Sequence, residues 1–260
     1  MFMSMSTLPP LNLTVGIDSI FTEMPFEQRL EHVADQGFTA FEFGKRDGKD
    51  MNITLALKTA LRLEVSAFLG STSSLVDAMQ HAQFENEIMR SASLAVDLSC
   101  SHLIVYSGTT LSNVPRIEQH NNIVAGLRTV VPIAQDAGVT LLLEPLNPID
   151  HPGNYLISSK EGLQIIREVN SPHVRLLFNI YHQQISEGNL SARLINNLDM
   201  VGYIHVADVP GKHEPGTGEI NYRYLFRLLR EQKFQGFVGL DYIPLGNPVI
   251  GLKAVRAMSQ

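Results

Sequence analysis

Four polar residues each close a short apolar segment of the chain, and their types are those that bind metals and move protons. They are Glu144, Asn179, His205 and Asp241, and they stand 35, 26 and 36 residues apart. Burying a carboxylate is costly unless it has a partner or a function. The spacing is about that of one strand-plus-helix unit, which predicts equivalent heights on adjacent strands of one parallel sheet. We therefore take these four residues as candidates for one shared site.

The donor types favour a divalent metal together with an acid/base pair. Oxygen and imidazole ligands suit Mn²⁺, Mg²⁺ or Co²⁺, and the single nitrogen favours Mn²⁺ or Co²⁺. The two carboxylates, Glu144 and Asp241, would balance the charge of one such ion, and each could act in turn as base and acid. The alternative is that all four residues are ordinary polar strand caps bonded to neighbouring loops.

Further candidates lie where a substrate would bind. His182 follows Asn179 by three residues, and a loop turning back over the sheet would bring its imidazole near a substrate oxygen. A later stretch rich in Gly and Pro carries Lys212, His213 and Glu214, which could clamp a polar substrate. The simpler interpretation makes each of these a hydrogen-bonding or solvated side chain.

Two weaker candidates, Glu42 and Lys45, follow an apolar segment near the N-terminus and could line the same mouth. Cys100 lies between a helix-like and a strand-like segment and is expected in the core. No Cys/His/Asp arrangement typical of a nucleophile is apparent.

Eight short apolar segments alternate with amphipathic ones. Most are apolar on both faces, as parallel strands covered on both sides are. We expect strands over residues 13–17, 40–43, 64–69, 102–106, 139–144, 174–179, 203–207 and 237–241. We expect helices over residues 25–36, 74–97, 115–137, 158–169, 191–197, 222–232 and 248–258.

This alternation, in a chain of 260 residues, predicts a single α/β domain folded as a (β/α)8 TIM barrel, whose typical size is about 250 residues. We expect residues 1–10 to be a disordered leader and residues 11–260 to form the barrel. A doubly wound sheet is the alternative, but it would favour a Gly-rich phosphate turn after the first strand, and the residues after Gly16 form no such turn. In a barrel, the carboxyl ends of the strands meet at one mouth, where enzymes of this fold place their active sites.

Composition excludes several classes of partner. The net charge is −6 and no run of Lys or Arg is visible, so no nucleic acid is expected. No signal peptide is recognisable and no apolar run approaches the roughly 20 residues of a membrane span, so no membrane is expected either. The single cysteine, Cys100, excludes an intramolecular disulfide and favours a cytoplasmic location.

Four blocks of the sequence resemble the hydroxypyruvate isomerase family, and the likeness is strongest between Val139 and Pro244. The blocks are Glu144-Pro-Leu-Asn, Asp150-His-Pro-Gly, Phe178-Asn-Ile-Tyr-His-Gln-Gln-Ile-Ser-Glu-Gly and Val209-Pro-Gly-Lys-His-Glu-Pro-Gly-Thr-Gly-Glu-Ile-Asn-Tyr. That family belongs to the xylose isomerase-like TIM-barrel superfamily, which also contains ketose 3-epimerases and a DNA-repair endonuclease branch. The last block is too long to arise by chance.

The resemblance implies a metal-dependent isomerase of the aldose–ketose type, an intramolecular oxidoreductase acting on a short 2-keto, hydroxy-carbonyl or sugar substrate. It implies a divalent metal held at Glu144, Asn179, His205 and Asp241, with the first and last acids shuttling a proton between adjacent carbons. It also implies that His182 and residues 212–214 contact the substrate. The alternatives are a ketose 3-epimerase, an endonuclease of the related branch, and a catalytically weakened sugar-binding homologue. Members of the superfamily often pair, so a homo-oligomer is also considered.

Two positions depart from the family pattern. The family usually has Asp where this chain has Asn179, and Glu where it has Asp241. The amide of Asn179 removes one negative charge, so metal affinity should fall. The shorter side chain of Asp241 would withdraw its carboxylate by about one C–C bond, roughly 1.5 Å. Misplacement of roughly 1 Å can cost about a hundredfold in rate, so activity could be reduced or redirected.

Overall fold

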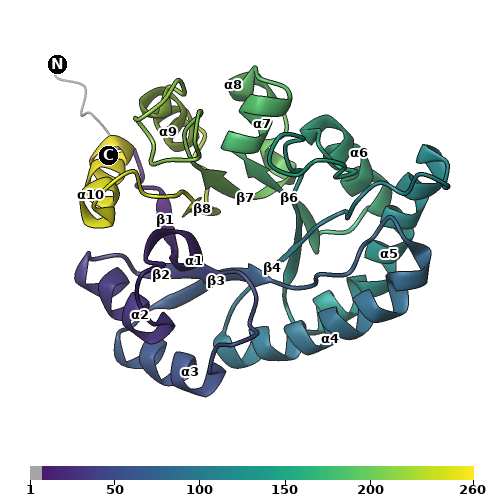
Figure 1. Ribbon diagram of the computed structural model, residues 1–260, viewed down its shortest axis with the longest axis horizontal. Helices are drawn as coiled ribbons and strands as arrows, with labels where there is room; N and C mark the ends of the chain where they lie inside the picture. The colour runs from purple at the N-terminus through teal and green to yellow at the C-terminus, as the bar shows by residue number, and fades with distance from the viewer. Residues whose placement is uncertain (1–7) are drawn as a thin grey trace, which may run out of the picture.

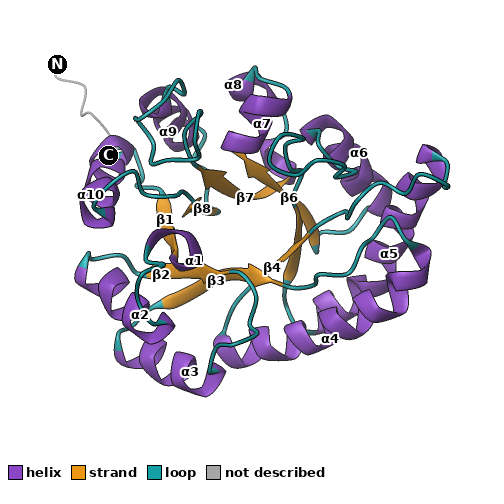
Figure 2. Cartoon of the chain, viewed as in Figure 1, coloured by secondary structure: helices purple, strands orange, loops and turns teal. Residues whose placement is uncertain are grey.

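The computed structural model describes residues 8–260 and forms a closed barrel of eight parallel strands in sequential order. Figures 1 and 2 look along this barrel, with the strands as an inner ring and the helices outside it. The strands are β1 (Asn12–Gly16), β2 (Ala40–Phe43), β3 (Glu64–Leu69), β4 (His102–Val105), β5 (Thr140–Leu143), β6 (Val174–Asn179), β7 (Val201–Val206) and β8 (Phe237–Leu240). The predicted fold class is confirmed. The predicted leader lies, for residues 1–7, outside the described residues.

The helices that cover the barrel follow the strands in order along the chain. They are α1 (Ile17–Ile20), α2 (Phe26–Asp35), α3 (Met51–Ala60), α4 (His81–Leu98), α5 (Arg116–Asp136), α6 (Ser159–Val169), α7 (Ile180–Ser186), α8 (Leu190–Ile195), α9 (Tyr222–Glu231) and α10 (Pro248–Ser259). Two 3₁₀ turns, η1 (Ala78–Gln80) and η2 (Leu198–Met200), complete the set. No helix among residues 8–260 combines the length and apolar character needed to cross a bilayer.

The predicted strands differ from the observed ones by one or two residues at their ends, and β2, β3 and β6 match at both ends. The helices are less well predicted. The helix expected from residue 74 begins only at His81, because the Asp77 side chain accepts from the backbone N–H of Met79 and starts a 3₁₀ turn first. Helix α3 is absent from the prediction because Thr54 is its only buried residue, so it lacks an apolar stripe.

Helix α7 corrects a second expectation. His182 was expected on a loop, but it lies in the first turn of α7, directly after β6. The side chain of Asn179 accepts a hydrogen bond from the His182 backbone N–H at 3.2 Å and so caps the helix. Asn179 therefore ends a strand and begins a helix at the same residue, which fixes the orientation of its amide.

The core has two parts, as expected for a closed barrel. The larger apolar cluster lies between the strands and the helices, whereas a small cluster built around Ala67, Ile104, Leu142, Leu177 and Tyr203 fills the barrel interior. The interior also contains polar groups. The hydroxyl oxygen of Tyr203 lies 2.8 Å from Ser66 Oγ, which lies 2.7 Å from Thr14 Oγ1, and all three residues are fully buried. Buried hydroxyl groups occur together in this way because each supplies the hydrogen-bond partner that the other needs.

The loop after β3 is tied down by one carboxylate on α4. Glu87 Oε2 accepts hydrogen bonds from Ser71 Oγ at 2.6 Å and from the backbone N–H groups of Thr72 at 2.9 Å and Ser73 at 3.3 Å. Partial burial alone would raise the pKa of Glu87, but these hydrogen bonds outweigh it and lower the pKa to about 2. The ionised side chain therefore contributes to holding this loop.

We expect Glu87→Gln to lower the free energy of unfolding at neutral pH by about 1–2 kcal/mol, allowing for solvent screening at this half-buried position. Because the pKa of Glu87 is depressed in the fold, its contribution is present above pH 4.5 and is lost as the pH falls toward 2. Urea unfolding at pH 7 and pH 2.5 measures both values, with the exposed Glu31→Gln as control. A deficit of equal size at both pH values would contradict the assignment.

Candidate active site

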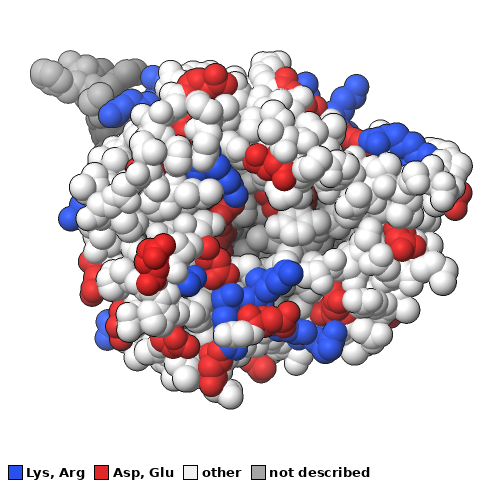
Figure 3. All heavy atoms as spheres, viewed as in Figure 1, with Lys and Arg blue, Asp and Glu red and all other residues white. Residues whose placement is uncertain are grey.

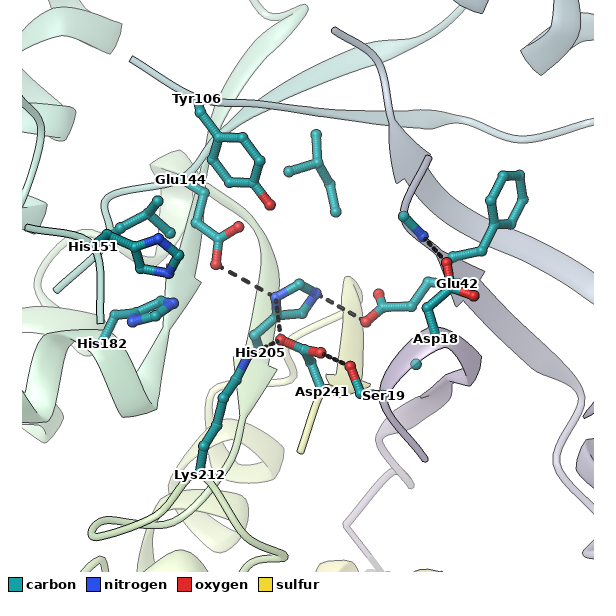
Figure 4. A pocket seen from close by; sticks show the side chains of 15 residues that line it. Asp18, Ser19, Glu42, Tyr106, Glu144, His151, His182, His205, Lys212 and Asp241 are labelled. Atoms are coloured by element: carbon teal, nitrogen blue, oxygen red, sulfur yellow. Dashed lines mark hydrogen bonds and ion pairs between the residues drawn. The ribbon is translucent and has the colours of Figure 1, made fainter. Parts of the chain in front are cut away.

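A cavity of about 190 Å³ opens at the carboxyl ends of the strands. It lies at the mouth expected for a barrel enzyme. Figure 3 shows the hollow at the centre of this face, with acidic and basic side chains at its rim. Figure 4 shows that Glu42, Glu144, His205 and Asp241 converge there from β2 and from the ends of β5, β7 and β8.

His205 lies between three carboxylates. Its Nε2 is 3.0 Å from Glu42 Oε1, and its Nδ1 is 3.5 Å from Glu144 Oε1 and 4.0 Å from Asp241 Oδ2 (Figure 4). None of these contacts has the alignment of a hydrogen bond, so both ring nitrogens are buried without a hydrogen-bond partner among residues 8–260. Such an atom is rare in a folded protein and points to a missing partner or a function.

The charges around His205 act on one another. Burial alone would lower the pKa of His205, but the carboxylates of Glu42 and Glu144 outweigh it and hold the pKa well above its usual value. Burial alone would likewise raise the pKa of Glu144, and the neighbouring His205 reverses this and lowers it. Both acids facing Nδ1 are thus ionised at neutral pH, because the pKa of Asp241 is also lowered, by Lys212 and His205 against the effect of burial.

Asp241 is held on two sides. Ser19 Oγ donates to its Oδ1 at 2.6 Å, and Lys212 Nζ lies 2.8 Å from its Oδ2. The backbone of Lys212 has a φ of 58°, in the left-handed region that costs a residue with a side chain roughly 1–2 kcal/mol. Strain of this kind persists where the surroundings impose it, often at functional sites. Here it brings the ammonium group into the cavity.

Asp208 is the residue that shapes the loop carrying Lys212. Its carboxylate is fully buried and accepts four backbone hydrogen bonds across that loop. Oδ1 accepts from Val209 and Ile220, each at 3.0 Å, and Oδ2 accepts from Gly216 at 2.8 Å and Gly218 at 2.9 Å. A single buried carboxylate thus ties both ends of the loop to its middle.

We expect Asp208→Asn to lower the free energy of unfolding by about 2–4 kcal/mol, because an amide NH₂ would face two N–H donors. We also expect at least a roughly tenfold loss of turnover, since Lys212 would shift with the loop. Urea unfolding and substrate turnover measure the two effects. The exposed Asp199→Asn, which removes the same charge, is the control and should match the wild type. Unchanged stability in the Asp208 variant would exclude this role.

Asn179 and Glu144 form a pair at the back of the cavity. Asn179 Nδ2 donates to Glu144 Oε1 at 2.8 Å, while its Oδ1 accepts from the His182 backbone N–H. The amide therefore presents its NH₂ group to Glu144. It can offer its oxygen to the cavity only by exchanging both of these hydrogen bonds.

His182 lines the cavity and is held by Asn147. Asn147 Nδ2 lies 2.7 Å from His182 Nδ1, and Asn147 Oδ1 accepts from the backbone N–H groups of Ile149 and Asp150, which fixes the amide orientation. Burial lowers the pKa of His182 to about 4, so the ring is neutral at pH 7. Its Nδ1 accepts from Asn147, which leaves Nε2 as an N–H donor for a ligand oxygen.

The donors that face one another have the chemistry of a divalent-metal site. With bonds of about 2.1–2.2 Å, two donors of one ion lie about 3.0–4.4 Å apart, depending on the angle between them. The distances from His205 Nδ1 to Glu144 and Asp241 fall within that range. Among residues 8–260, no group of three His, Cys, Asp or Glu side chains is placed so that it could hold a metal ion as it stands, so side-chain movements would be needed. With that movement, the residues are compatible with a metal.

Most of the sequence candidates lie together. Glu144, His182, His205, Lys212 and Asp241 all line the cavity, and Asn179 lies directly behind Glu144.

His213 and Glu214 lie outside the cavity, although they belong to the same loop as Lys212. His213 Nδ1 lies 2.8 Å from the carbonyl oxygen of Ile243, and Glu214 accepts from the backbone N–H of Leu245 at 2.9 Å. Both side chains therefore fasten the loop to the segment after β8.

Two residues contact the proposed site residues more closely than the sequence indicates. Glu42 is only a weak candidate from sequence, although it is an acid in an apolar strand, as Glu144 is an acid at the end of one. Ser19, which binds Asp241, has no sequence signal, because α1 is a four-residue helix with no pattern of its own.

The chain is similar to known proteins both in sequence and in structure. The family described as xylose isomerase-like TIM barrel matches residues 30–257. Hydroxypyruvate isomerase of Escherichia coli is 27% identical, over 94% of this chain and 97% of that protein. The 2-oxo-tetronate isomerase of Cupriavidus necator is 29% identical, over 91% of this chain and 94% of that protein.

A solved structure shares the whole architecture. The crystal structure titled AP endonuclease, family 2, from Brucella melitensis superimposes with a TM-score of 0.89 at 26% identity, covering 94% of this chain and 97% of that chain.

Proposed function

The chain belongs to the xylose isomerase-like TIM barrel family and is an isomerase, and from this premise we propose that it interconverts a short hydroxy-carbonyl substrate with the help of a divalent metal. The substrate class we favour is a three- or four-carbon 2-keto acid, as in the names of the two relatives. One observation carries the proposal: a buried His205 Nδ1 without a hydrogen-bond partner faces two ionised carboxylates across the cavity.

The metal would be held by Glu144, His205 and Asp241, with Asn179 as a fourth ligand if its amide oxygen turns toward the cavity. When bound, an ion of the Mn²⁺, Mg²⁺ or Co²⁺ type would polarise the carbonyl group and stabilise the negative charge that develops as a neighbouring C–H bond breaks.

The two acids would carry the proton. Glu144 takes the proton from the hydroxyl-bearing carbon next to the carbonyl group, while the ionised Asp241 takes the proton of that hydroxyl group. Asp241 then gives its proton to the former carbonyl carbon and Glu144 gives its proton to the former carbonyl oxygen, so that both carboxylates are ionised again. Two carboxylates suit a reversible reaction because each acts as base in one direction and as acid in the other. Both are ionised at rest, as a base must be.

Two further residues would bind and orient the substrate. The Nε2–H group of the neutral His182 can donate to a substrate oxygen, and its partner Asn147 keeps the ring in that tautomer. Lys212 supplies a cation beside Asp241, where a substrate carboxylate or hydroxyl group would lie. His213 and Glu214 would act on the substrate only through the loop they fasten.

The cavity volume supports a short substrate. A cavity of about 190 Å³ has room for a small substrate such as a chain of three or four carbons.

Proton NMR in deuterated water tests the proposal. The purified protein, with and without added Mg²⁺, is mixed with hydroxypyruvate, four-carbon 2-keto acids and longer ketoses. We expect metal-dependent deuterium uptake next to the carbonyl group of a three- or four-carbon substrate. Product identity separates aldose–ketose isomerisation from epimerisation at a single carbon.

Two results would overturn the proposal. Absence of exchange with every substrate, in folded and metal-loaded protein, would favour a sugar-binding homologue. Metal-dependent cleavage of a DNA duplex containing an abasic site would place the chain instead with the activity named for the Brucella structure.

A further inference from the structure

We propose that Glu42, itself held by Tyr203, is the positioning residue that turns the imidazole of His205 so that Nδ1 faces Glu144 and Asp241. This inference rests on the proposed function, because it assigns Nδ1 to the metal. It adds Glu42 in the wall of the cavity and Tyr203 in the barrel interior to the machinery of the site.

Both oxygens of the Glu42 carboxylate are engaged. Oε1 lies 3.0 Å from His205 Nε2, and Oε2 accepts a hydrogen bond from the Tyr203 hydroxyl. The three residues are at most 4% exposed. A carboxylate at that depth is unfavourable unless it is paired. Glu42 finds its partners on β7, where Tyr203 and His205 point to the same side of the strand as residues i and i+2.

The contact continues across the barrel. Tyr203 lies against Ser66 of β3, and Ser66 lies against Thr14 of β1. The result is a column of polar groups from four strands, closed to solvent, with Glu42 and His205 at its upper end. Side chains held at both ends lose the freedom to rotate, and this is how rigid partners orient a ligand.

Two glycines leave room for this pair. A Cβ atom on Gly239 of β8 would lie 2.7 Å from His205 Cδ2 and 2.8 Å from both carboxylate oxygens of Glu42. A Cβ atom on Gly16 of β1 would lie 2.9 Å from the backbone oxygen of Leu240 and 3.3 Å from Glu42 Oε1. Neither glycine has a positive φ, so backbone conformation does not require them. At Gly239 the reason that the structure offers for glycine is the space occupied by Glu42 and His205, whereas at Gly16 the backbone of β8 is closer than Glu42.

The chemical consequence concerns the two ring nitrogens. A carboxylate beside Nε2 favours the tautomer that carries its proton there, and the lone pair then lies on Nδ1. That is the form in which an imidazole binds a metal. Removing the partner of a metal-binding histidine lowers metal affinity by about 10–100-fold in other proteins.

Three variants test the inference. Glu42→Gln replaces the carboxylate by an amide of the same shape, and Tyr203→Phe removes only the hydroxyl that holds it. Tyr155→Phe is the matched control, because its buried hydroxyl also donates to a carboxylate, that of Glu161 at 3.0 Å, but away from the cavity. The readouts are the Kd for Mn²⁺ from titration calorimetry, the visible spectrum of the Co²⁺-loaded protein, and deuterium exchange into substrate.

We expect Glu42→Gln to raise the Kd for Mn²⁺ by about tenfold or more and to change the Co²⁺ spectrum. Tyr203→Phe should act in the same direction by about threefold to tenfold. Tyr155→Phe should leave both readouts unchanged. If Glu42→Gln does not fold, Tyr203→Phe carries the test alone.

An unchanged Kd and spectrum in folded Glu42→Gln, or in Tyr203→Phe where the former does not fold, would overturn the positioning role. Failure of the proposed function looks different. A wild-type protein that binds Mn²⁺ but exchanges no proton would refute the isomerase mechanism and would leave the Kd comparison intact. A wild-type protein that binds no Mn²⁺ would refute both.

Discussion

We expect Glu144→Gln to lower the rate of proton exchange into the substrate by at least about a thousandfold. General acid–base groups contribute roughly 10²–10⁴-fold, and Glu144 would act both as base and as metal ligand. The amide has the same shape as the carboxylate, and its oxygen can still accept the hydrogen bond from Asn179 Nδ2. The fold should therefore survive. Deuterium uptake from solvent into substrate, followed by NMR with Mg²⁺ in excess, measures the loss.

The control for Glu144→Gln is Glu118→Gln on the exposed surface of α5, which should exchange protons at the wild-type rate. Calorimetric titration with Mn²⁺ then separates a lost base from a lost ligand. Near-normal exchange in a folded and metal-loaded Glu144→Gln protein would reject Glu144 as the base.

Asn179→Asp is the second variant with a large expected effect. We expect it to destabilise the protein without metal and to strengthen metal binding. One oxygen of the new carboxylate would continue to cap α7, while the other would stand where Asn179 Nδ2 now lies, 2.8 Å from Glu144 Oε1. Without metal, these like charges repel, and we expect a loss of about 1–3 kcal/mol of stability. With metal, the added ligand charge should lower the Kd for Mn²⁺ by about tenfold to a hundredfold.

Thermal unfolding in chelator and in excess Mn²⁺ checks both halves of this expectation. The melting temperature of Asn179→Asp should lie below that of the wild type in chelator and should rise by more when Mn²⁺ is added, since binding to the native state stabilises it by mass action. The exposed Asn113→Asp makes the same chemical change on the surface and should show neither effect. Equal metal affinity in Asn179→Asp and the wild type would mean that this position stays out of the metal site.

The barrel was predictable from sequence because its strands are buried on both faces. The segment Val174–Asn179 is apolar apart from Arg175 and its last residue, Asn179, which marks the end that reaches the mouth. The same reasoning identifies Glu144, His205 and Asp241, since a polar group at the carboxyl end of a buried barrel strand lies at the barrel mouth.

The helices and loops were harder to predict because contacts with other segments decide them. Helix α7 begins where Asn179 caps it, and this capping also turns the amide NH₂ of Asn179 toward Glu144, which no residue spacing could reveal. Likewise, Lys212 points into the cavity while its neighbour His213 points to the segment after β8, because Asp208 fixes the loop from within.

The same logic explains Glu42. An acid in the strand Ala40–Phe43 predicts a group at the barrel mouth, but its role depends on Tyr203 and His205, which lie 161 and 163 positions later in the chain. Spacing along the sequence indicates which strand ends share a face, whereas partnership across the barrel becomes visible only in three dimensions.

Lys212 forms an ion pair with Asp241, and the imidazole of His205 lies between Glu42 and Glu144. These two positive side chains offset part of the repulsion among the three acids of the site, so the barrel can fold without a bound metal. Under the proposed function, protein made during a shortage would persist as an intact reserve and be loaded when the ion returns. Abundance would then follow synthesis, while activity would follow the metal supply.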